Sequence, residues 1–455
     1  MNQVELPITP LPQPLDLLIV PRWIIPVVPA GVVLEEHALA VHEGRIVALL
    51  PVAHCEDLQV RERCERPDHL LIPGLVNAHG HAAMTLLRGL ADDLPLMTWL
   101  EQHIWPAERR HVNADFVATG TRLAIAEMLR GGTTCFADMY FYPAIAAQTA
   151  IDCGIRAQIA FPLLDHPIPG VPDCASGLQQ GLQLHDELRH QSLVSLAFGP
   201  HAPYTVSDDN LLRIRTLADE VDLPIHMHVH ESADEIAGSL QQYGERPLQR
   251  LQRLGLLGPR LQAVHMTQVD DSDLALLSRH DVQVVHCPQS NLKLASGFCP
   301  VQRLLQAGVN VALGTDGAAS NNDLDLLDEL RTAALLAKAV SGEPTALQAH
   351  KALHMATLAG ACALGLEQQT GSLEPGKQAD LTLIDLGDPL LQPVYDPLSH
   401  LLYSSNSRQV SDVWVAGRRR LSNGQLATDL LPADIHQQVA NWAARIKKED
   451  QPDES

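Results

Sequence analysis

The feature that most constrains the fold is a repeated pattern, in which a short apolar run closed by polar residues precedes a segment of helical spacing. One such segment, residues 115–130, ends at Gly131-Gly132, and another follows Ser207, which suits a helix N-cap. A strand followed by a helix, repeated along a chain, predicts a parallel sheet. The eight runs read as strands are residues 70–79, 133–139, 156–165, 194–203, 224–231, 261–266, 282–288 and 310–317.

Polar side chains gather at the carboxyl ends of these runs. In an eight-stranded β/α barrel these ends converge on one face, where barrel enzymes build their active sites. A doubly wound open sheet is the main alternative, but it would not bring its first and last strands around one point. We therefore predict an α/β fold, a (β/α)8 TIM-type barrel. The polar residues at or near strand ends are His79, Asp138, Asp165, His201, His228, His265, His286 and Asp316.

Outside the barrel region, the pattern changes to alternating strands separated by glycine-containing turns. Residues 17–52 and 371–425 read as hairpins, and neither segment is long enough to form a stable sheet alone. We expect both termini to pair into a small composite β-sandwich domain. The expected divisions are 1–69 for the N-terminal part, 70–370 for the barrel and 371–455 for the C-terminal part, with a frayed tail from residue 446.

Composition excludes several classes of protein. Hydrophobic residues make up 46% of the 455 positions, which is enough for a sizeable core and too much for a disordered chain. A formal net charge of −22 repels phosphate backbones and anionic lipids, so we expect no nucleic-acid or membrane partner. The eight cysteines include no CxxC pair, and the apolar stretch at residues 15–34 carries Arg22 and several prolines. We therefore expect a cytoplasmic protein with reduced thiols.

Histidines at strand ends predict a metal site. His79 and His81 lie two apart and can direct both imidazoles at one ion, although such a pair is weak evidence in a chain with 22 histidines. His265 ends the sixth strand. Asp316 ends the eighth, where a buried carboxylate requires a cation.

The fifth strand carries His226, His228 and His230, followed directly by Glu231. Not all three histidines can be ligands if the other strands also contribute. We assign His228, because Glu231 then lies three residues on, at the mouth of the strand, free to move a proton. His226 and His230 are interpreted as hydrogen-bonded residues of the core or behind the ligands.

The predicted ligand set suits Zn²⁺, and Fe²⁺ or Mn²⁺ would also bind it. Many barrel hydrolases bridge two metals with a modified lysine from an interior strand, but no lysine precedes Lys293 here. We therefore predict one ion per subunit.

Asp316 is placed to accept a proton from water, Glu231 to carry one to a ring nitrogen, and His265 to orient the attacking oxygen or polarise the developing tetrahedral centre. The set suits attack on an amidine-like or amide carbon. The five candidate ligands are His79, His81, His228, His265 and Asp316.

Six segments of the chain resemble the amidohydrolase superfamily and, within it, the 5′-methylthioadenosine/S-adenosylhomocysteine deaminases and their triazine-hydrolase relatives. The resemblance runs nearly end to end. It implies a barrel with a composite β domain, one zinc ion, and hydrolytic loss of ammonia from C6 of an adenine ring. The segments are PGLVNAHGHAAMTLLRGLADDLPLMTWL, FGPHAPYTVS, HMHVHESADE, HCPQSNLKLASG, GTDGAASNNDLDLL and GSLEPGKQADLTLIDL.

The resemblance also implies roles for single residues. Glu231 resembles the proton shuttle, and His265 the histidine beside the attacking water, which leaves His265 either a ligand or a neighbour of the ligands. Glu108, in IWPAE, resembles the residue that accepts the ribose hydroxyls, and His201, in GPHAPY, resembles a further substrate contact. The zinc ligands implied by the resemblance are His79, His81, His228 and Asp316.

One segment departs from the family pattern. Some members place an arginine near the end of the third strand to bind a substrate carboxylate, whereas this chain reads IAFPLLD there, with Phe161 and Pro162. S-adenosylhomocysteine carries such a carboxylate and 5′-methylthioadenosine does not. We therefore expect methylthioadenosine as substrate, with S-adenosylhomocysteine and adenosine as alternatives. An apolar slot for the methylthio group is expected from Leu96, Met97, Trp99, Phe141 and Tyr142.

The competing hypotheses differ in whether they retain the predicted catalytic metal site. An amino- or chlorohydrolase of s-triazines, guanine or another aminated heterocycle would keep it. A zinc cytidine-deaminase fold would need a PCxxC segment, which the sequence lacks. A non-catalytic barrel that acts as a binding protein is a hypothesis of another class, disfavoured because every candidate ligand and Glu231 are present. The apolar barrel helices also make a homodimer the expected assembly.

Overall fold

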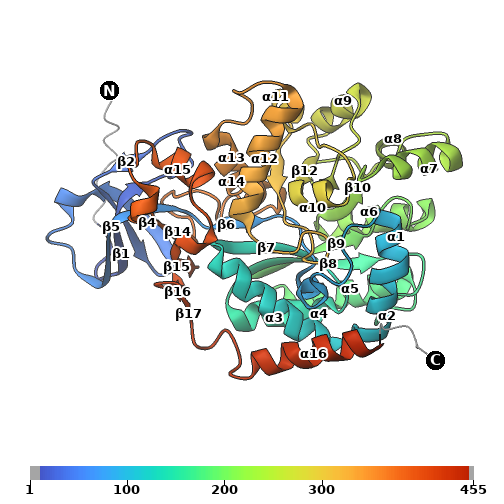
Figure 1. Cartoon of the computed structure of the whole chain (residues 1–455), viewed down its shortest axis with the longest axis horizontal. Helices are drawn as coiled ribbons and strands as arrows, with labels where there is room; N and C mark the ends of the chain where they lie inside the picture. Colours follow the sequence, from blue (N-terminus) through green and yellow to red (C-terminus); the bar gives the residue numbers. More distant parts are fainter. Residues whose placement is uncertain (1–10, 450–455) are drawn as a thin grey trace.

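The computed structural model describes residues 11–449, which form a barrel with a sheet beside it (Figure 1). Eight parallel strands follow one another around the barrel in chain order. Backbone hydrogen bonds from Ala78 to Leu313 (2.8 Å) and from Asp316 to His79 (3.1 Å) join the last strand to the first. The predicted barrel is confirmed. Its strands are β6 (Leu75–Asn77), β7 (Thr133–Met139), β8 (Arg156–Leu163), β9 (Val194–Pro200), β10 (Ile225–Val229), β11 (Leu261–His265), β12 (Gln283–His286) and β13 (Val311–Leu313).

Helices surround the strands, and side-chain capping accounts for the start of some of them but not all. Asn113 caps α3 (Ala114–Arg130) by accepting hydrogen bonds from the N–H groups of the first turn, and the helix ends at Gly131. Ser207 stands at the N-cap position of α6 (Asp208–Val221), but its side chain accepts no capping bond. Its N–H instead donates to Asp165 at 2.9 Å. The other outer helices are α4 (Pro143–Cys153), α5 (Cys174–Leu188), α7 (Ala233–Tyr243), α8 (Pro247–Arg253), α9 (Asp271–Arg279), α10 (Pro288–Lys293), α11 (Val301–Gln306), α12 (Leu326–Ser341), α13 (Ala349–Met355) and α14 (Leu358–Ala363).

Both termini contribute to one nine-stranded mixed sheet, which confirms the predicted composite β domain. The two parts meet where β14 pairs antiparallel with β5, while β5 pairs parallel with β1. The division of the chain at residues 69 and 370 stays a prediction. The strands of this sheet are β1 (Leu15–Ile24), β2 (Leu34–Glu35), β3 (His37–His42), β4 (Arg45–Pro51), β5 (Val60–Pro73), β14 (Leu381–Asp385), β15 (Val410–Val415), β16 (Arg418–Ser422) and β17 (Gln425–Leu426).

A buried ion pair ties the sheet to the barrel. Arg156, the first residue of β8, donates to Asp380 at 2.9 Å, and both side chains are almost wholly buried. Asp380 Oδ1 accepts hydrogen bonds from Arg156 Nη2 at 3.3 Å and from the Ala416 N–H at 2.6 Å, and Arg156 also donates to the Ser192 carbonyl oxygen at 3.2 Å. Because each charge has its partner and further hydrogen bonds, this pair can remain ionised inside the protein.

The expected tail from residue 446 is wrong for its first residues. Helix α16 (Ile435–Glu449) continues through Ile446, which is 4% exposed, and runs along α3, where Trp442 and Phe116 meet edge to face with ring centroids 5.3 Å apart (Figure 1). Ile435, Trp442 and Ile446 recur at helical spacing, so burial of one face holds the helix to the barrel. Residues 450–455 lie outside the described residues. Within residues 11–449, no helix is long and apolar enough to cross a lipid bilayer.

Candidate metal centre and active-site pocket

The candidate site lies at the carboxyl ends of the barrel strands. His79 and His81 follow β6, His228 lies in β10, His265 ends β11, and Asp316 follows β13. Strand closure brings these residues together, as predicted. At the seam, a side chain on Gly314 would place its Cβ only 2.8 Å from the Cβ of His79, so glycine permits this close approach.

The nitrogen and oxygen atoms of this cluster face one another. His79 Nε2 lies 3.4 Å and His81 Nε2 lies 3.2 Å from Asp316 Oδ1, and His228 Nε2 lies 3.3 Å from His79 Nε2. Two overlapping sets of ligand atoms lie within 4.8 Å of one another, namely those of His79, His228 and His265 and those of His79, His81 and Asp316. Two imidazole lone pairs at this separation repel each other unless a cation or a proton lies between them, so the donor set fits a metal ion.

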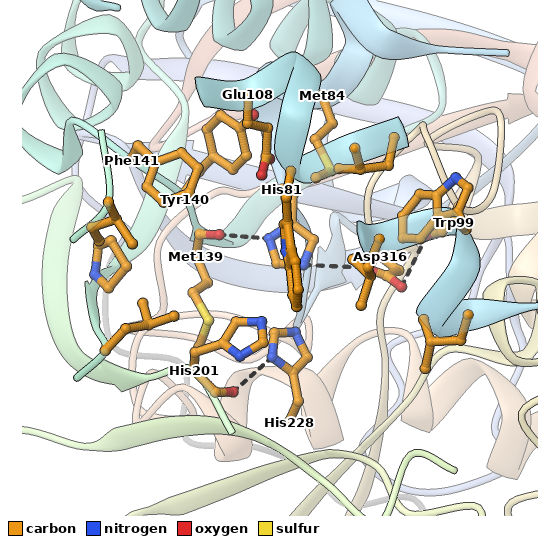
Figure 2. A pocket seen from close by; sticks show the side chains of 18 of the residues that line it. His81, Met84, Trp99, Glu108, Met139, Tyr140, Phe141, His201, His228 and Asp316 are labelled. Atoms are coloured by element: carbon orange, nitrogen blue, oxygen red, sulfur yellow. Dashed lines mark hydrogen bonds and ion pairs between the residues drawn. The ribbon is translucent and has the colours of Figure 1, made fainter. Parts of the chain in front are cut away.

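The hydrogen-bond partners of the Nδ1 atoms, which face away from the cluster, show which ring nitrogen carries the proton. His81 Nδ1 lies 2.5 Å from the Met139 carbonyl oxygen, and His228 Nδ1 lies 2.8 Å from the His201 carbonyl oxygen (Figure 2). A carbonyl oxygen only accepts, so Nδ1 carries the proton in both rings. Their Nε2 lone pairs therefore point into the cluster, as metal ligation requires.

The Asp316 carboxylate is held on both oxygens. Its Oδ2 accepts hydrogen bonds from Ser290 (2.6 Å) and Ser320 (3.0 Å), and its Oδ1 accepts the Gly317 N–H at 2.8 Å. Burial raises the pKa of Asp316, but the adjacent imidazoles of His79 and His81 outweigh it and hold the pKa well below its usual range. The carboxylate is therefore ionised and aimed at the imidazoles.

Glu231 sits beside this cluster on a tight turn after β10. Residue His230 adopts a left-handed backbone (φ 55°), and the Glu231 N–H donates to Glu235 at 2.7 Å. Thr267 donates to the Glu231 carbonyl oxygen at 2.7 Å. The carboxylate then lies 3.8 Å from His265 Nε2, and burial raises the pKa of Glu231. The backbone is thus held independently of the carboxylate, which faces the pocket.

One pocket opens over the cluster, and it contains the three remaining residues singled out from the sequence, Glu108, His201 and Trp99. Glu108, on α2 (Trp105–His111), is 5% exposed, and burial raises its pKa to about 7. It faces Tyr140 above His81 in Figure 2. His201 follows β9, and burial lowers its pKa to about 3, which leaves the imidazole neutral.

The apolar slot is only partly as expected. Leu96, Trp99 and Phe141 line the pocket, whereas Met97 and Tyr142 are not among the described residues that line it. Residues 96, 99 and 100 all line the pocket, on α1 (Leu96–Trp99) and at the start of the next turn, and residue 97 points to another face of this helical segment.

Several residues of the pocket and its surroundings were not expected from the sequence. Arg109, an exposed residue of α2, lines the pocket together with His166 and Tyr204. An arginine that could bind a substrate carboxylate was expected only near the end of the third strand, so Arg109 on α2 was not predicted. Ser290 and Asn291 were also missed, although both lie in the segment HCPQSN, where Asn291 Oδ1 is 2.9 Å from His265 Nδ1.

A parallel barrel with clustered imidazoles and a carboxylate at its mouth defines the class of metal-dependent barrel hydrolases. The model of the amidohydrolase family matches residues 70–420. The chain belongs to the amidohydrolase family, and the predicted resemblance is confirmed.

Known relatives cover almost the whole chain. A 5-methylthioadenosine/S-adenosylhomocysteine deaminase of Saccharophagus degradans is 50% identical over 435 residues, 95% of this chain and 97% of the relative. The crystal structure of an adenosine deaminase from Xanthomonas campestris with bound zinc has a TM-score of 0.94 and 50% identity, and covers 96% of this chain and 100% of that one. Atrazine chlorohydrolase from Arthrobacter aurescens, complexed with zinc, has a TM-score of 0.86 at 24% identity, covers 94% of this chain and 100% of that one, and shares the fold.

Proposed function

We propose that this chain is a zinc-dependent aminohydrolase that converts 5′-methylthioadenosine to 5′-methylthioinosine and ammonia. The observation that carries the proposal is the convergence of four imidazoles with Asp316 beneath a pocket that also holds Glu231 and Glu108. The 50% identity to a 5-methylthioadenosine/S-adenosylhomocysteine deaminase supports the choice of an adenine nucleoside.

One zinc ion per subunit would be held by His79, His81, His228 and Asp316. When bound, zinc lowers the pKa of a coordinated water from about 15.7 to about 7. His265 is proposed to lie beside the ligands, because Asn291 holds its Nδ1 while its Nε2 faces Glu231. Within residues 11–449, no lysine lines the pocket, which supports a single ion.

The side chains divide the proton transfers between them. Asp316 accepts the proton that the attacking water loses when oxygen bonds to C6 of the adenine ring. Glu231 delivers a proton to the ring nitrogen N1, so that negative charge does not build up on the ring, and His265 orients the water. The proton held by Asp316 then passes to the amino group, the C6 hydroxyl gives its remaining proton to Glu231, and the C6–N bond breaks to release ammonia and leave the C6 carbonyl.

The rest of the pocket would recognise the sugar and its 5′ substituent. The Glu108 carboxyl is proposed to accept ribose hydroxyls, with His201 as a further contact. Leu96, Trp99 and Phe141 form an apolar wall suited to a methylthio group.

A second substrate is favoured by one observation. Arg109 lines the pocket from α2, so a guanidinium is present although the third strand supplies none. S-adenosylhomocysteine carries a carboxylate at the far end of its 5′ substituent, and an arginine binds a carboxylate through two parallel hydrogen bonds. We therefore include S-adenosylhomocysteine, with adenosine, as a substrate of the same site.

Ammonia release measured across a panel tests the proposal. The panel contains methylthioadenosine, S-adenosylhomocysteine, adenosine, guanine and two aminated s-triazines, each with metal content measured in parallel. We expect the highest kcat/KM for methylthioadenosine. Turnover of guanine or triazines alone would replace this function by the alternative one, and absence of both metal and turnover would support a non-catalytic binding protein.

Three further expectations stay predictions: zinc rather than iron or manganese, a homodimer, and a cytoplasmic location. Metal analysis by mass spectrometry tests the first and light scattering the second. Fractionation of the source cells tests the third.

A further inference from the structure

A chain of four buried polar side chains leads from His79 away from the pocket and across the barrel interior. His79 Nδ1 lies 2.7 Å from His226 Nε2, and His226 Nδ1 lies 2.5 Å from Gln262 Oε1. Gln262 Nε2 in turn lies 2.8 Å from Gln158 Oε1. All four side chains are at most 1% exposed. Polar groups buried this deeply carry a cost unless their hydrogen bonds are complete.

The two glutamine amides have only one orientation that satisfies their neighbours. Gln262 Nε2 donates to the Ala363 carbonyl oxygen at 2.7 Å as well as to Gln158, and Gln158 Nε2 donates to the Leu364 carbonyl oxygen at 3.1 Å. Backbone carbonyl oxygens only accept, so turning either amide over would set oxygen against oxygen. Gln262 Oε1 therefore faces His226 as an acceptor.

This orientation determines the protons along the rest of the chain. His226 Nδ1 must carry a proton to donate to Gln262. Within residues 11–449, no carboxylate pairs with His226, so a second proton would be an uncompensated buried charge, and His226 Nε2 is an acceptor. His79 Nδ1 consequently carries its proton, and the lone pair of His79 Nε2 points into the cluster.

The two other imidazoles proposed as ligands hold their Nδ1 protons through backbone atoms. His81 and His228 use the carbonyl oxygens of Met139 and His201. His79 has a side-chain relay instead, whose inner members lie on neighbouring strands, where His226 of β10 pairs with Gln262 of β11. The tautomer of His79 that can bind a metal therefore depends on side chains, which a mutation can change.

We propose that Gln262, acting through His226, is a positioning residue that holds His79 in its metal-binding tautomer and so sets the metal affinity of the site. The inference rests on the metal centre of the proposed function. Gln158 and the Ala363 carbonyl orient Gln262 in turn. Removal of hydrogen-bonding partners behind metal ligands typically costs about 10–100-fold in metal affinity.

Zinc alone, in competition with a chromophoric chelator and without nucleoside, is the probe. The variants are Gln262→Met, which removes the acceptor, and Gln158→Met, which makes the same change one step further along the relay and leaves Gln262 Oε1 oriented by Ala363. Thermal unfolding of each metal-free protein reports the structural cost of the change. Both variants lose buried amide hydrogen bonds, so both are expected to unfold at lower temperature.

We expect Gln262→Met to bind zinc about 10–100-fold more weakly than the unchanged protein, and Gln158→Met to bind it within about threefold of the unchanged protein. Zinc affinity that follows unfolding temperature across the unchanged protein and the two variants would mean a merely structural role and overturn the proposal. So would a zinc affinity of Gln262→Met equal to that of the unchanged protein. If the unchanged protein itself binds no zinc, the proposed function fails first, and the two failures are thereby distinguished.

Discussion

The substitution Glu231→Gln removes the proposed proton carrier and leaves the surrounding hydrogen bonds in place. The Glu231 N–H is held by Glu235 at 2.7 Å and its carbonyl by Thr267 at 2.7 Å, and neither bond uses the side chain that changes. Glutamine has the same shape, so the pocket and the imidazole cluster should persist. An amide cannot accept and release the proton destined for the ring nitrogen. Positioned acid–base catalysis contributes about 10²–10⁴-fold to a rate, so kcat should fall by that factor, about 2.7–5.4 kcal/mol in activation free energy.

The assay follows ammonia release from methylthioadenosine, with metal content and unfolding temperature measured on the same preparation. Asp234→Asn is the matched control, because Asp234 is exposed on the first turn of α7 and makes the same carboxylate-to-amide change. We expect the control to match the unchanged protein and Glu231→Gln to retain its metal. A kcat within threefold of the unchanged protein would remove Glu231 from the mechanism, and loss of metal together with activity would assign it to the metal site instead.

Three other substitutions test separate parts of the account. Arg109→Met should lower kcat/KM for S-adenosylhomocysteine by about tenfold or more, because a hydrogen bond to a charged group contributes about 1.5–3 kcal/mol. The kcat/KM for methylthioadenosine should stay within twofold of that of the unchanged protein. Equal losses on both substrates would contradict a role of Arg109 in binding the carboxylate. Glu108→Gln should raise KM and also flatten the pH dependence of stability. Burial raises the pKa of Glu108 to about 7, so its folded carboxyl holds a proton more tightly than the unfolded one, and this contribution to stability is present below about pH 4.5 and lost as the pH rises through about 7. The unfolding temperature of Glu108→Gln, followed by fluorescence from pH 5 to 8, should therefore fall less than that of the unchanged protein, and an identical fall would be inconsistent. Arg156→Met should cost about 3–5 kcal/mol in urea denaturation, because it leaves Asp380 charged and buried, and adding Asp380→Asn should recover part of the loss; no recovery would mean that the cost comes from packing alone.

The cluster of candidate ligands could be predicted because each of its residues lies at the end of its own strand. His79, His228 and Asp316 each follow or end an apolar run, and a parallel barrel places all such ends on one face. No distance between strands had to be known. The repeated pattern of apolar runs and helical segments predicted the strands of the barrel, and the shortness of the two hairpin segments predicted the pairing of the termini.

The relay behind His79 could not be predicted in this way. Gln262 and Gln158 are single polar residues inside apolar strands, and their meeting depends on the register of β10 with β11 and on the curvature that brings β8 opposite them. The position of Arg109 in the pocket could not be predicted for a related reason. This residue comes from a helix inserted between the first strand and α3, and no strand periodicity places it in the pocket.

Two errors had a signal that was present in the sequence. Residues 96, 99 and 100 share one helical face, so Met97 could have been excluded from the slot once a helix was assumed there. The charged end of the chain was interpreted as a tail, whereas Trp442 and Ile446 continue the apolar face of α16. In both cases the helical period was the information that was overlooked.

A crystal structure with a nucleoside transition-state analogue, a purine ribonucleoside bearing a hydroxyl at C6, would show where each proposed catalytic group acts. We expect the C6 hydroxyl to lie among His265, Asp316 and the metal, Glu231 to contact N1, and Glu108 to contact the ribose hydroxyls. Binding of the ring elsewhere, or a ribose that points toward Asp316 with Glu231 turned away from N1, would contradict it.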